Sequence, residues 1–133
     1  MAIFKDVPMV KEIFGDLWGK MIKDTEFGPK IKEGNISVLF IINDPNIVMY
    51  VDANGPIFDA EAEAKTALVT LKMDGDTVHK FWLRKVNVPK ALALRQIRAK
   101  GPVGTILQLL PLLKPGQEIY PEYCKKYNLP MDV

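Results

Sequence analysis

The chain has 133 residues, of which 48% are hydrophobic and 26% charged, and its formal net charge is +2, so we predict a single globular domain over residues 1–133. One Cys and one His exclude an internal disulfide and a Cys/His zinc site within the chain, which leaves only a metal held by carboxylates. The longest apolar run, residues 38–42, is far shorter than the roughly 20 residues that span a bilayer, and the first residues lack the apolar core of a signal peptide, so we expect a cytoplasmic protein.

The first half of the chain begins with a helix and continues with strands. Apolar residues spaced by three and four predict a helix over residues 7–24 with Asp6 as its N-cap, and a short helical turn follows over residues 29–33. The period then changes to two. We predict strands over residues 36–42, 47–53, 56–58 and 66–73, joined in part by a turn at Asn43-Asp44-Pro45-Asn46 and a hairpin at Asn54-Gly55. These strands form a predicted meander of three or four, and the first, apolar on both faces, is expected to be covered on both sides.

The second half of the chain is mainly helical. Asp74 caps a predicted helix that runs to about residue 85, and Pro89 starts a short helix. A short strand over residues 95–100 has Ile97 and Ala99 facing inward. A helix over residues 103–113 follows and is ended by Lys114-Pro115-Gly116, and a terminal helix then carries Tyr120, Tyr123 and Tyr127 on one face.

Charge is distributed unevenly. Residues 77–117 contain eight Lys or Arg and no Asp or Glu. Such a basic block can attract the phosphates of a nucleic acid or of an anionic lipid surface, and it can equally be a solvated face of the domain. It lacks exposed aromatic side chains for stacking on bases, because Phe81 and Trp82 fall on the apolar face of their own helix, so we expect no nucleic-acid binding.

Catalytic motifs are scarce. The only serine, Ser37, lies in an apolar strand, which argues against a Ser-His-Asp site. Asp74-Gly75-Asp76 fits a turn and helix cap better than a calcium loop, and residues 101–105 lack the lysine of a phosphate loop. Cys124 and His79 stand in no recognisable nucleophile motif.

The helix over residues 103–113 is apolar around much of its circumference. Such a helix is deeply buried, lines a cavity or contacts a partner. Burial or dimerisation and a hydrophobic ligand cavity are therefore both open.

The order of these elements resembles the sterol carrier protein 2 family over about residues 35–113. In that family a strand enters an Asp-led helix, a G-K-x-N-P turn leads to a short Ala-containing helix, and a basic strand of the form I-x-x-x-G opens an apolar helix. The matching positions here are Lys85, Asn87, Ala91, Ile97 and Gly101. The chain departs from the pattern at Arg84 and Arg95, where the family has glycine, and at Pro89, where the proline is displaced by one position.

The resemblance implies an α+β fold with a sheet of about five strands, a meander plus a later strand, covered by helices and enclosing a hydrophobic tunnel. It implies a non-enzymatic lipid-binding or lipid-transfer module for a fatty acyl chain, acyl-CoA, phospholipid, isoprenoid or sterol-like ligand, with no catalytic residue, metal or cofactor. We expect the tunnel lining to include Trp82, Val103, Ile106, Leu107, Leu110, Leu113 and Tyr123.

The basic block is expected to contact an anionic membrane or a ligand headgroup through Lys80, Arg84, Lys85, Arg95, Arg98 and Lys100. We expect a monomer or weak dimer. Two alternatives stay open: the apolar C-terminal helices form a protein-interaction or dimerisation surface, or Cys124 and His79 act on a lipid or thioester.

Overall fold

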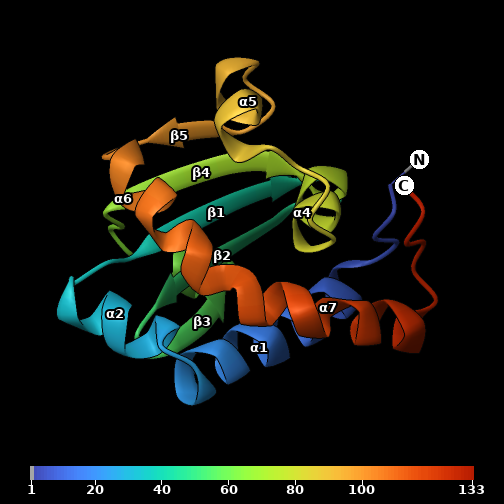
Figure 1. Ribbon diagram of the computed structural model, residues 1–133, viewed down its shortest axis with the longest axis horizontal. Coiled ribbons are helices and arrows are strands. Elements are labelled where there is room, and N and C mark those ends of the chain that lie inside the picture. The colour runs from blue at the N-terminus through green and yellow to red at the C-terminus, as the bar shows by residue number, and fades with distance from the viewer. Residues whose placement is uncertain (1) are drawn as a thin grey trace.

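A mixed sheet of five strands, in the order β3-β2-β1-β4-β5, forms the centre of the computed structural model, which describes residues 2–133 (Figure 1). Met1, which the predicted domain includes, lies outside the described residues. The strands are β1 (Val38–Asn43), β2 (Ile47–Asp52), β3 (Gly55–Phe58), β4 (Val69–Asp74) and β5 (Arg98–Lys100). The predicted α+β architecture is confirmed.

The first three strands form the predicted meander. β1 and β2 pair antiparallel across the predicted turn, and β2 and β3 pair antiparallel across the Asn54-Gly55 hairpin. Gly55 has φ of +113°, a conformation that favours glycine and explains the residue at this turn.

The position of β4 decides between the predicted meanders of three and of four strands in favour of three. β4 does not extend the meander beyond β3 but pairs parallel with β1, with Val38 opposite Val69, and β5 then pairs antiparallel with β4. A parallel pair needs a crossover, and this one includes the short helix α3 (Asp59–Glu63), which the sequence suggested only as an acidic stretch. Ala62 of α3 is fully buried and anchors the crossover.

The helices agree with the prediction in number and order, apart from α3. They are α1 (Val7–Asp24), α2 (Phe27–Glu33), α4 (Gly75–Trp82), α5 (Val88–Ala93), α6 (Val103–Leu109) and α7 (Lys114–Tyr127), with a 3-10 turn η1 (Leu110–Leu113) between the last two. The bounds of α1 are as predicted, and the Met9 N–H donates to the predicted cap Asp6 over 2.8 Å. Asp74 likewise caps α4 by accepting from the Thr77 N–H over 2.7 Å.

Two arginines take the place of the glycines that the family resemblance leads one to expect. Arg84 has φ of +64° and Arg95 has φ of +61°. This left-handed backbone follows α4 and α5 respectively, and it is the conformation for which glycine is the usual choice. The loops therefore have a glycine-type geometry without glycine, and they shorten α4 and β5 relative to the predicted segments.

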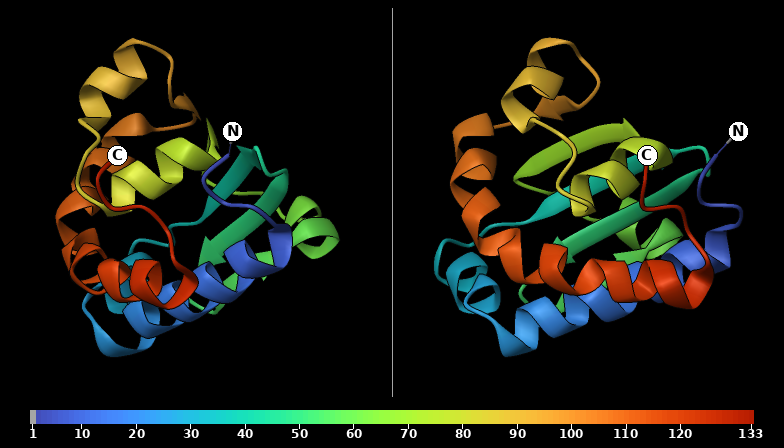
Figure 2. Two further views of the ribbon diagram at one scale, coloured as in Figure 1. Left: turned by 90° about the vertical axis from the view of Figure 1, so that its right-hand side faces the viewer. Right: turned by 45° about the vertical axis from the view of Figure 1, so that its right-hand side comes forward.

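The predicted break at Lys114-Pro115-Gly116 is wrong. These residues form the first turn of α7, so α6, η1 and α7 form one path without a loop (Figures 1 and 2). Pro115 is compatible with a helix here because the N–H groups of a first turn have no intrahelical partner. Gly116 lets α7 approach closely, since a Cβ atom at this position would lie 2.5 Å from Met21 Sδ and 2.7 Å from the Trp82 ring.

Helices α1 and α7 lie side by side along one end of the molecule, and α5 protrudes at the other end beyond β4 and β5 (Figures 1 and 2). The prediction that β1 is covered on both sides is only partly met. Val38 and Ile42 are buried, but Leu39 and Ile41, on the other face of the strand, are half-buried. No helix within residues 2–133 has the length and apolarity needed to cross a bilayer.

Candidate ligand-binding cavity

A cavity of about 90 Å³ lies between one face of the sheet and the helices. Its floor consists of alternate residues of neighbouring strands, because successive strand residues point to opposite faces. Val38, Phe40 and Ile42 of β1 lie beside Met49 of β2 and Leu71 of β4 in register, and Ala99 of β5 completes the row opposite Leu71.

The walls of the cavity come from helices far apart in the sequence. Phe14 and Trp18 of α1 form one side, Val78 and Trp82 of α4 another, and α2, α5, α6 and η1 contribute further apolar residues. All lining side chains are aliphatic, aromatic or the thioethers of methionine, and none carries a charge. The described residues also contain no group of three or more His, Cys, Asp or Glu side chains placed to hold a metal ion. The cavity therefore has the chemistry to hold an apolar molecule.

The structure places five of the seven predicted lining residues at this cavity: Trp82, Val103, Ile106, Leu110 and Leu113. It does not bring Leu107 or Tyr123 there. Leu107 is 38% exposed, because the residue after an inward-facing Ile106 is rotated by about 100° around the helix. The apolar excess of the segment over residues 103–113 is thus mostly turned toward the cavity, with Leu107 as an exception.

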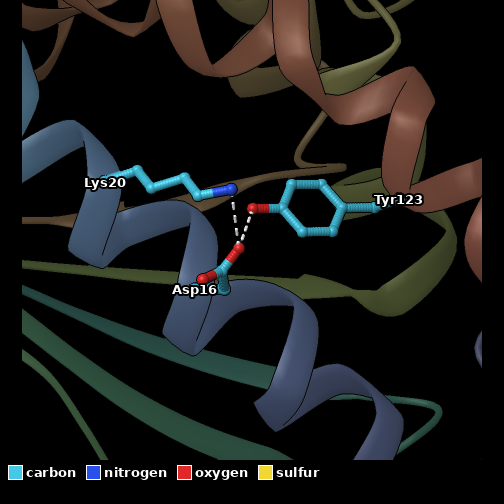
Figure 3. A network of polar contacts seen from close by, with 3 residues as sticks. All are labelled: Asp16, Lys20 and Tyr123. Carbon is cyan, nitrogen blue, oxygen red and sulfur yellow. Dashed lines mark hydrogen bonds and ion pairs between the residues drawn. The ribbon is translucent and has the colours of Figure 1, made fainter.

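Tyr123 belongs instead to a polar cluster between α1 and α7 (Figure 3). Its hydroxyl donates to the Asp16 carboxylate, and Lys20 Nζ lies 3.1 Å from the same carboxylate. The bond from Tyr123 lowers the pKa of Asp16, and burial of the ring, followed by the bond to Asp16, raises the pKa of Tyr123 to about 12. The cluster fastens α7 to α1 and is not part of the cavity.

The sequence analysis missed the floor of the cavity and the side formed by α1. The alternation of Val38, Phe40 and Ile42 was a signal for the floor, since it identifies the residues that share one face. Trp18 is one of the apolar residues whose spacing predicts the first helix, and that spacing gives it no role in a cavity. Alternation identifies an inward face but does not distinguish a packed face from a hollow one.

Gly101 explains how α6 comes to close the cavity. Its φ is +109°, and a Cβ atom here would lie 2.5 Å from the Leu68 carbonyl oxygen, so the position is strained for any other residue. The turn directs the chain from β5 into α6, which brings Val103 and Ile106 over the sheet. This is the glycine of the I-x-x-x-G pattern noted in the sequence.

Cys124 and His79 are buried and not arranged as a nucleophile and base. Cys124 is 1% exposed, and burial raises the pKa of its thiol, which disfavours the reactive thiolate. Both ring nitrogens of the fully buried His79 are engaged: Nε2–H donates to the Pro130 carbonyl over 2.6 Å, and Nδ1 accepts from the Tyr120 hydroxyl over 2.7 Å. The carbonyl can only accept, which fixes this tautomer. The geometry gives no support to catalysis by this pair.

The six predicted membrane-facing cations are all exposed, but two have partners on the protein. Lys85 Nζ donates to the main-chain oxygens of Met131 over 2.7 Å and of Val133 over 3.2 Å, and Arg84 lies 3.8 Å from Glu118. Within residues 2–133 the other four, Lys80, Arg95, Arg98 and Lys100, form no ion pair. Arg95, Arg98 and Lys100 follow Leu94, which is 58% exposed at the end of α5.

A small mixed sheet with helices packed around an apolar cavity defines the fold class of the protein. No protein-family model matches the sequence, and a comparison with curated proteins gives no significant match. Solved structures do match. Sterol carrier protein 2 from Yarrowia lipolytica in its apo form aligns with a TM-score of 0.61 and 17% identity, covering 81% of this chain and 89% of the other.

Two further structures agree. The sterol carrier protein domain 2 of Helicoverpa armigera aligns with a TM-score of 0.63 and 18% identity, over 83% of this chain and 89% of that one. Sterol carrier protein 2 like 2 from Aedes aegypti aligns with a TM-score of 0.55 and 14% identity, over 78% of this chain and 95% of that one. The chain thus has the sterol carrier protein 2 fold, as the sequence resemblance implied.

Proposed function

We propose that this protein is a non-enzymatic lipid carrier that holds one long-chain lipid in the cavity between the sheet and α6. The observation that carries the proposal is the cavity itself, which is lined only by uncharged, apolar residues on a sterol carrier protein 2 fold. Burial of a sixteen-carbon chain at about 0.8 kcal/mol per CH₂ gives a gross gain of roughly 13 kcal/mol. Association and ordering costs of several kcal/mol leave micromolar or tighter binding.

The ligand classes that fit this lining are a fatty acyl chain, an acyl-CoA, a phospholipid, an isoprenoid and a sterol-like molecule. At about 90 Å³ the cavity is smaller than the roughly 150 Å³ that accommodates one benzene, so it must widen to take a long chain. Val103 and Leu110 of the wall are only half-buried, so α6 and η1 are the part that we expect to move.

The test is to look for a ligand that the protein carries when it is purified. Native mass spectra are compared with spectra of denatured, solvent-extracted protein, and a fluorescent fatty acid is titrated into the delipidated protein. We expect either a released lipid mass or binding at micromolar or lower Kd. Protein without a bound mass that also fails to bind the fluorescent fatty acid contradicts the carrier function. A concentration-dependent dimer in sedimentation experiments would then favour the protein-interaction alternative.

We also propose that the carrier docks on anionic membranes through the end of α5 and the segment that follows. Arg95, Arg98 and Lys100 supply positive charge, and the exposed Leu94 between α5 and Arg95 can enter the interface. Each cation near an anionic surface contributes about 1 kcal/mol. Lys80 adds to the same block, whereas Lys85 and Arg84 are partly occupied by their partners on the protein.

Vesicle binding is expected to depend on anionic lipid and on salt. Raising the salt from about 0.1 M to about 1 M shortens the Debye length from about 10 Å to about 3 Å and should release the protein. The double variant Arg95→Gln, Arg98→Gln should bind anionic vesicles roughly thirtyfold more weakly, from about 1 kcal/mol per charge. Lys30→Gln, an exposed lysine on α2, serves as the matched control. Equal sedimentation with anionic and neutral vesicles at both salt concentrations would refute the docking surface.

A further inference from the structure

One side chain in the wall of the cavity carries a buried polar atom that has no hydrogen-bond partner. Trp18 of α1 lines the cavity and is 4% exposed. Its Nε1–H is the one buried side-chain N or O atom among the described residues that lacks a partner. A buried donor without an acceptor is unfavourable, so this indole needs an explanation.

The neighbours of Trp18 supply no acceptor oxygen. The indole packs against three aromatic rings at centroid distances of 5.4 Å to Phe27, 5.8 Å to Phe40 and 5.3 Å to Trp82. All three rings line the same cavity. The Trp82 ring stands at 83° to the indole, an edge-to-face contact, and an aromatic face is a much weaker acceptor than an oxygen atom. The protein surroundings therefore leave the donor unsatisfied.

A water molecule is a poor partner at this place. A buried water needs two to four polar partners, and apolar cavities that lack them stay dry. The only lining side chains with any N or O atom are the two tryptophans, and an indole N–H can only donate. A molecule whose body makes apolar contacts and which carries a single oxygen acceptor fits the cavity better than water does.

We infer that the ligand of this cavity carries an uncharged oxygen acceptor, a carbonyl, ester, ether or hydroxyl oxygen, which accepts a hydrogen bond from Trp18 Nε1 inside the cavity. This inference rests on the proposed lipid-carrier function and adds that the part of the ligand inside the cavity carries an oxygen atom. An ionised carboxylate is excluded at this position, because burial of a charge with one neutral partner among apolar side chains is far more costly than burial of a carbonyl. A charged headgroup belongs at the solvent-exposed end of such a ligand.

The test compares two ligands of equal chain length, a linear hydrocarbon and the corresponding mid-chain ketone, each measured by displacement of a fluorescent fatty acid. The quantity of interest is the ratio of their two Kd values, because desolvation of the ketone is the same for every protein variant. Trp18→Phe keeps an aromatic ring but removes the donor. We expect this variant to weaken ketone binding relative to hydrocarbon binding by about tenfold, which corresponds to about 1.4 kcal/mol for one buried hydrogen bond. Thr70→Val, on the face of β4 that points away from the cavity, removes a hydroxyl outside the site and is the control that should leave the ratio unchanged.

An independent readout uses the wild-type protein alone. In a ¹⁵N–¹H spectrum the Trp18 indole proton is expected to move downfield when the ketone binds and to remain near its ligand-free position when the hydrocarbon binds. An unchanged Kd ratio in Trp18→Phe, or an indole proton that responds equally to both ligands, overturns the inference while the carrier function stands. If neither ligand displaces the fluorescent fatty acid, the inference falls, and if the fluorescent fatty acid itself does not bind, the carrier function falls with it.

Discussion

His79→Leu is expected to lower the free energy of unfolding by about 3 kcal/mol near neutral pH. The substitution is close to isosteric, but it leaves the Tyr120 hydroxyl and the Pro130 carbonyl without the partner each has at 2.6–2.7 Å in the wild type. Each buried polar group left unpaired costs about 1–3 kcal/mol. Urea denaturation gives the measurement. Lys80→Leu, at the next and exposed position of α4, is the control and should change the unfolding free energy by no more than about 0.5 kcal/mol.

The same residue should make the wild-type protein sensitive to mild acid. Burial, the largest contribution, lowers the pKa of His79 below its ordinary value of 6.5, with Lys80 and Lys85 acting in the same direction and Asp76 and the Pro130 carbonyl opposing them. Below pH 6.5 the unfolded chain therefore takes up a proton that the folded protein does not. The unfolding free energy falls as the pH decreases from there, by at most about 1.4 kcal/mol per pH unit, until the folded pKa is reached.

His79 is the only histidine of the chain, so the effect can be assigned without ambiguity. In His79→Leu the unfolding free energy should vary little over the first pH unit below 6.5, before the carboxylates titrate. Parallel pH dependences in the two proteins would show that His79 does not control the acid sensitivity.

Ala99→Phe is expected to weaken fatty acid binding by more than tenfold while the protein remains folded. Ala99 is the smallest side chain of the cavity wall and lies opposite Leu71 in the sheet, so a phenyl ring here occupies space that the ligand needs. Overpacking of this half-buried site on the short edge strand β5 should lower the unfolding free energy by at most about 3 kcal/mol. The measurements are the Kd of a fluorescent fatty acid and the unfolding free energy.

Thr70→Phe provides the control for Ala99→Phe. Thr70 is the neighbour of Leu71 on β4 and points to the other face of the sheet, away from the cavity. The Thr70→Phe substitution adds a ring of the same size outside the site, so the Kd of this variant for the fluorescent fatty acid should stay near that of the wild type. Retention of wild-type affinity in Ala99→Phe would show that the lipid binds elsewhere.

What could be predicted from the sequence was mainly what local residue patterns determine. The 3-4 spacing from Val10 to Met21 and the Asp6 cap were enough to define α1, and Asn54-Gly55 was enough to define a hairpin. The pairing of β4 with β1 was missed because Val38 and Val69 are brought together by the crossover and not by any signal in the two strands. The arginines at positive φ were missed because only glycine signals that conformation clearly in a sequence.

In the candidate site, too, local residue patterns predicted some features, while others depend on tertiary packing. The unusually apolar segment at residues 103–113, together with the family resemblance, predicted that Ile106 and Leu113 face a cavity, and both line it. The outward direction of Leu107 and the bond from Tyr123 to Asp16 depend on the rotation of α6 and α7 against their neighbours. Trp18 is the clearest example. Its spacing places it on an apolar helix face, but the lack of a partner for its N–H is a property of three elements packed together.

The packing of α1 against α7 has a consequence for biosynthesis. Ile13, Phe14 and Leu17 of α1 are completely buried, yet α7 lies near the other end of the chain, with Tyr123 and its partner Asp16 107 residues apart. An isolated helix of this length is only marginally stable, and α2 and β3 cover only part of its apolar stripe before α7 leaves the ribosome. The domain therefore completes its core only when α7 has been synthesised, and a nascent chain halted before α7 exposes apolar surface to chaperones and to other nascent chains.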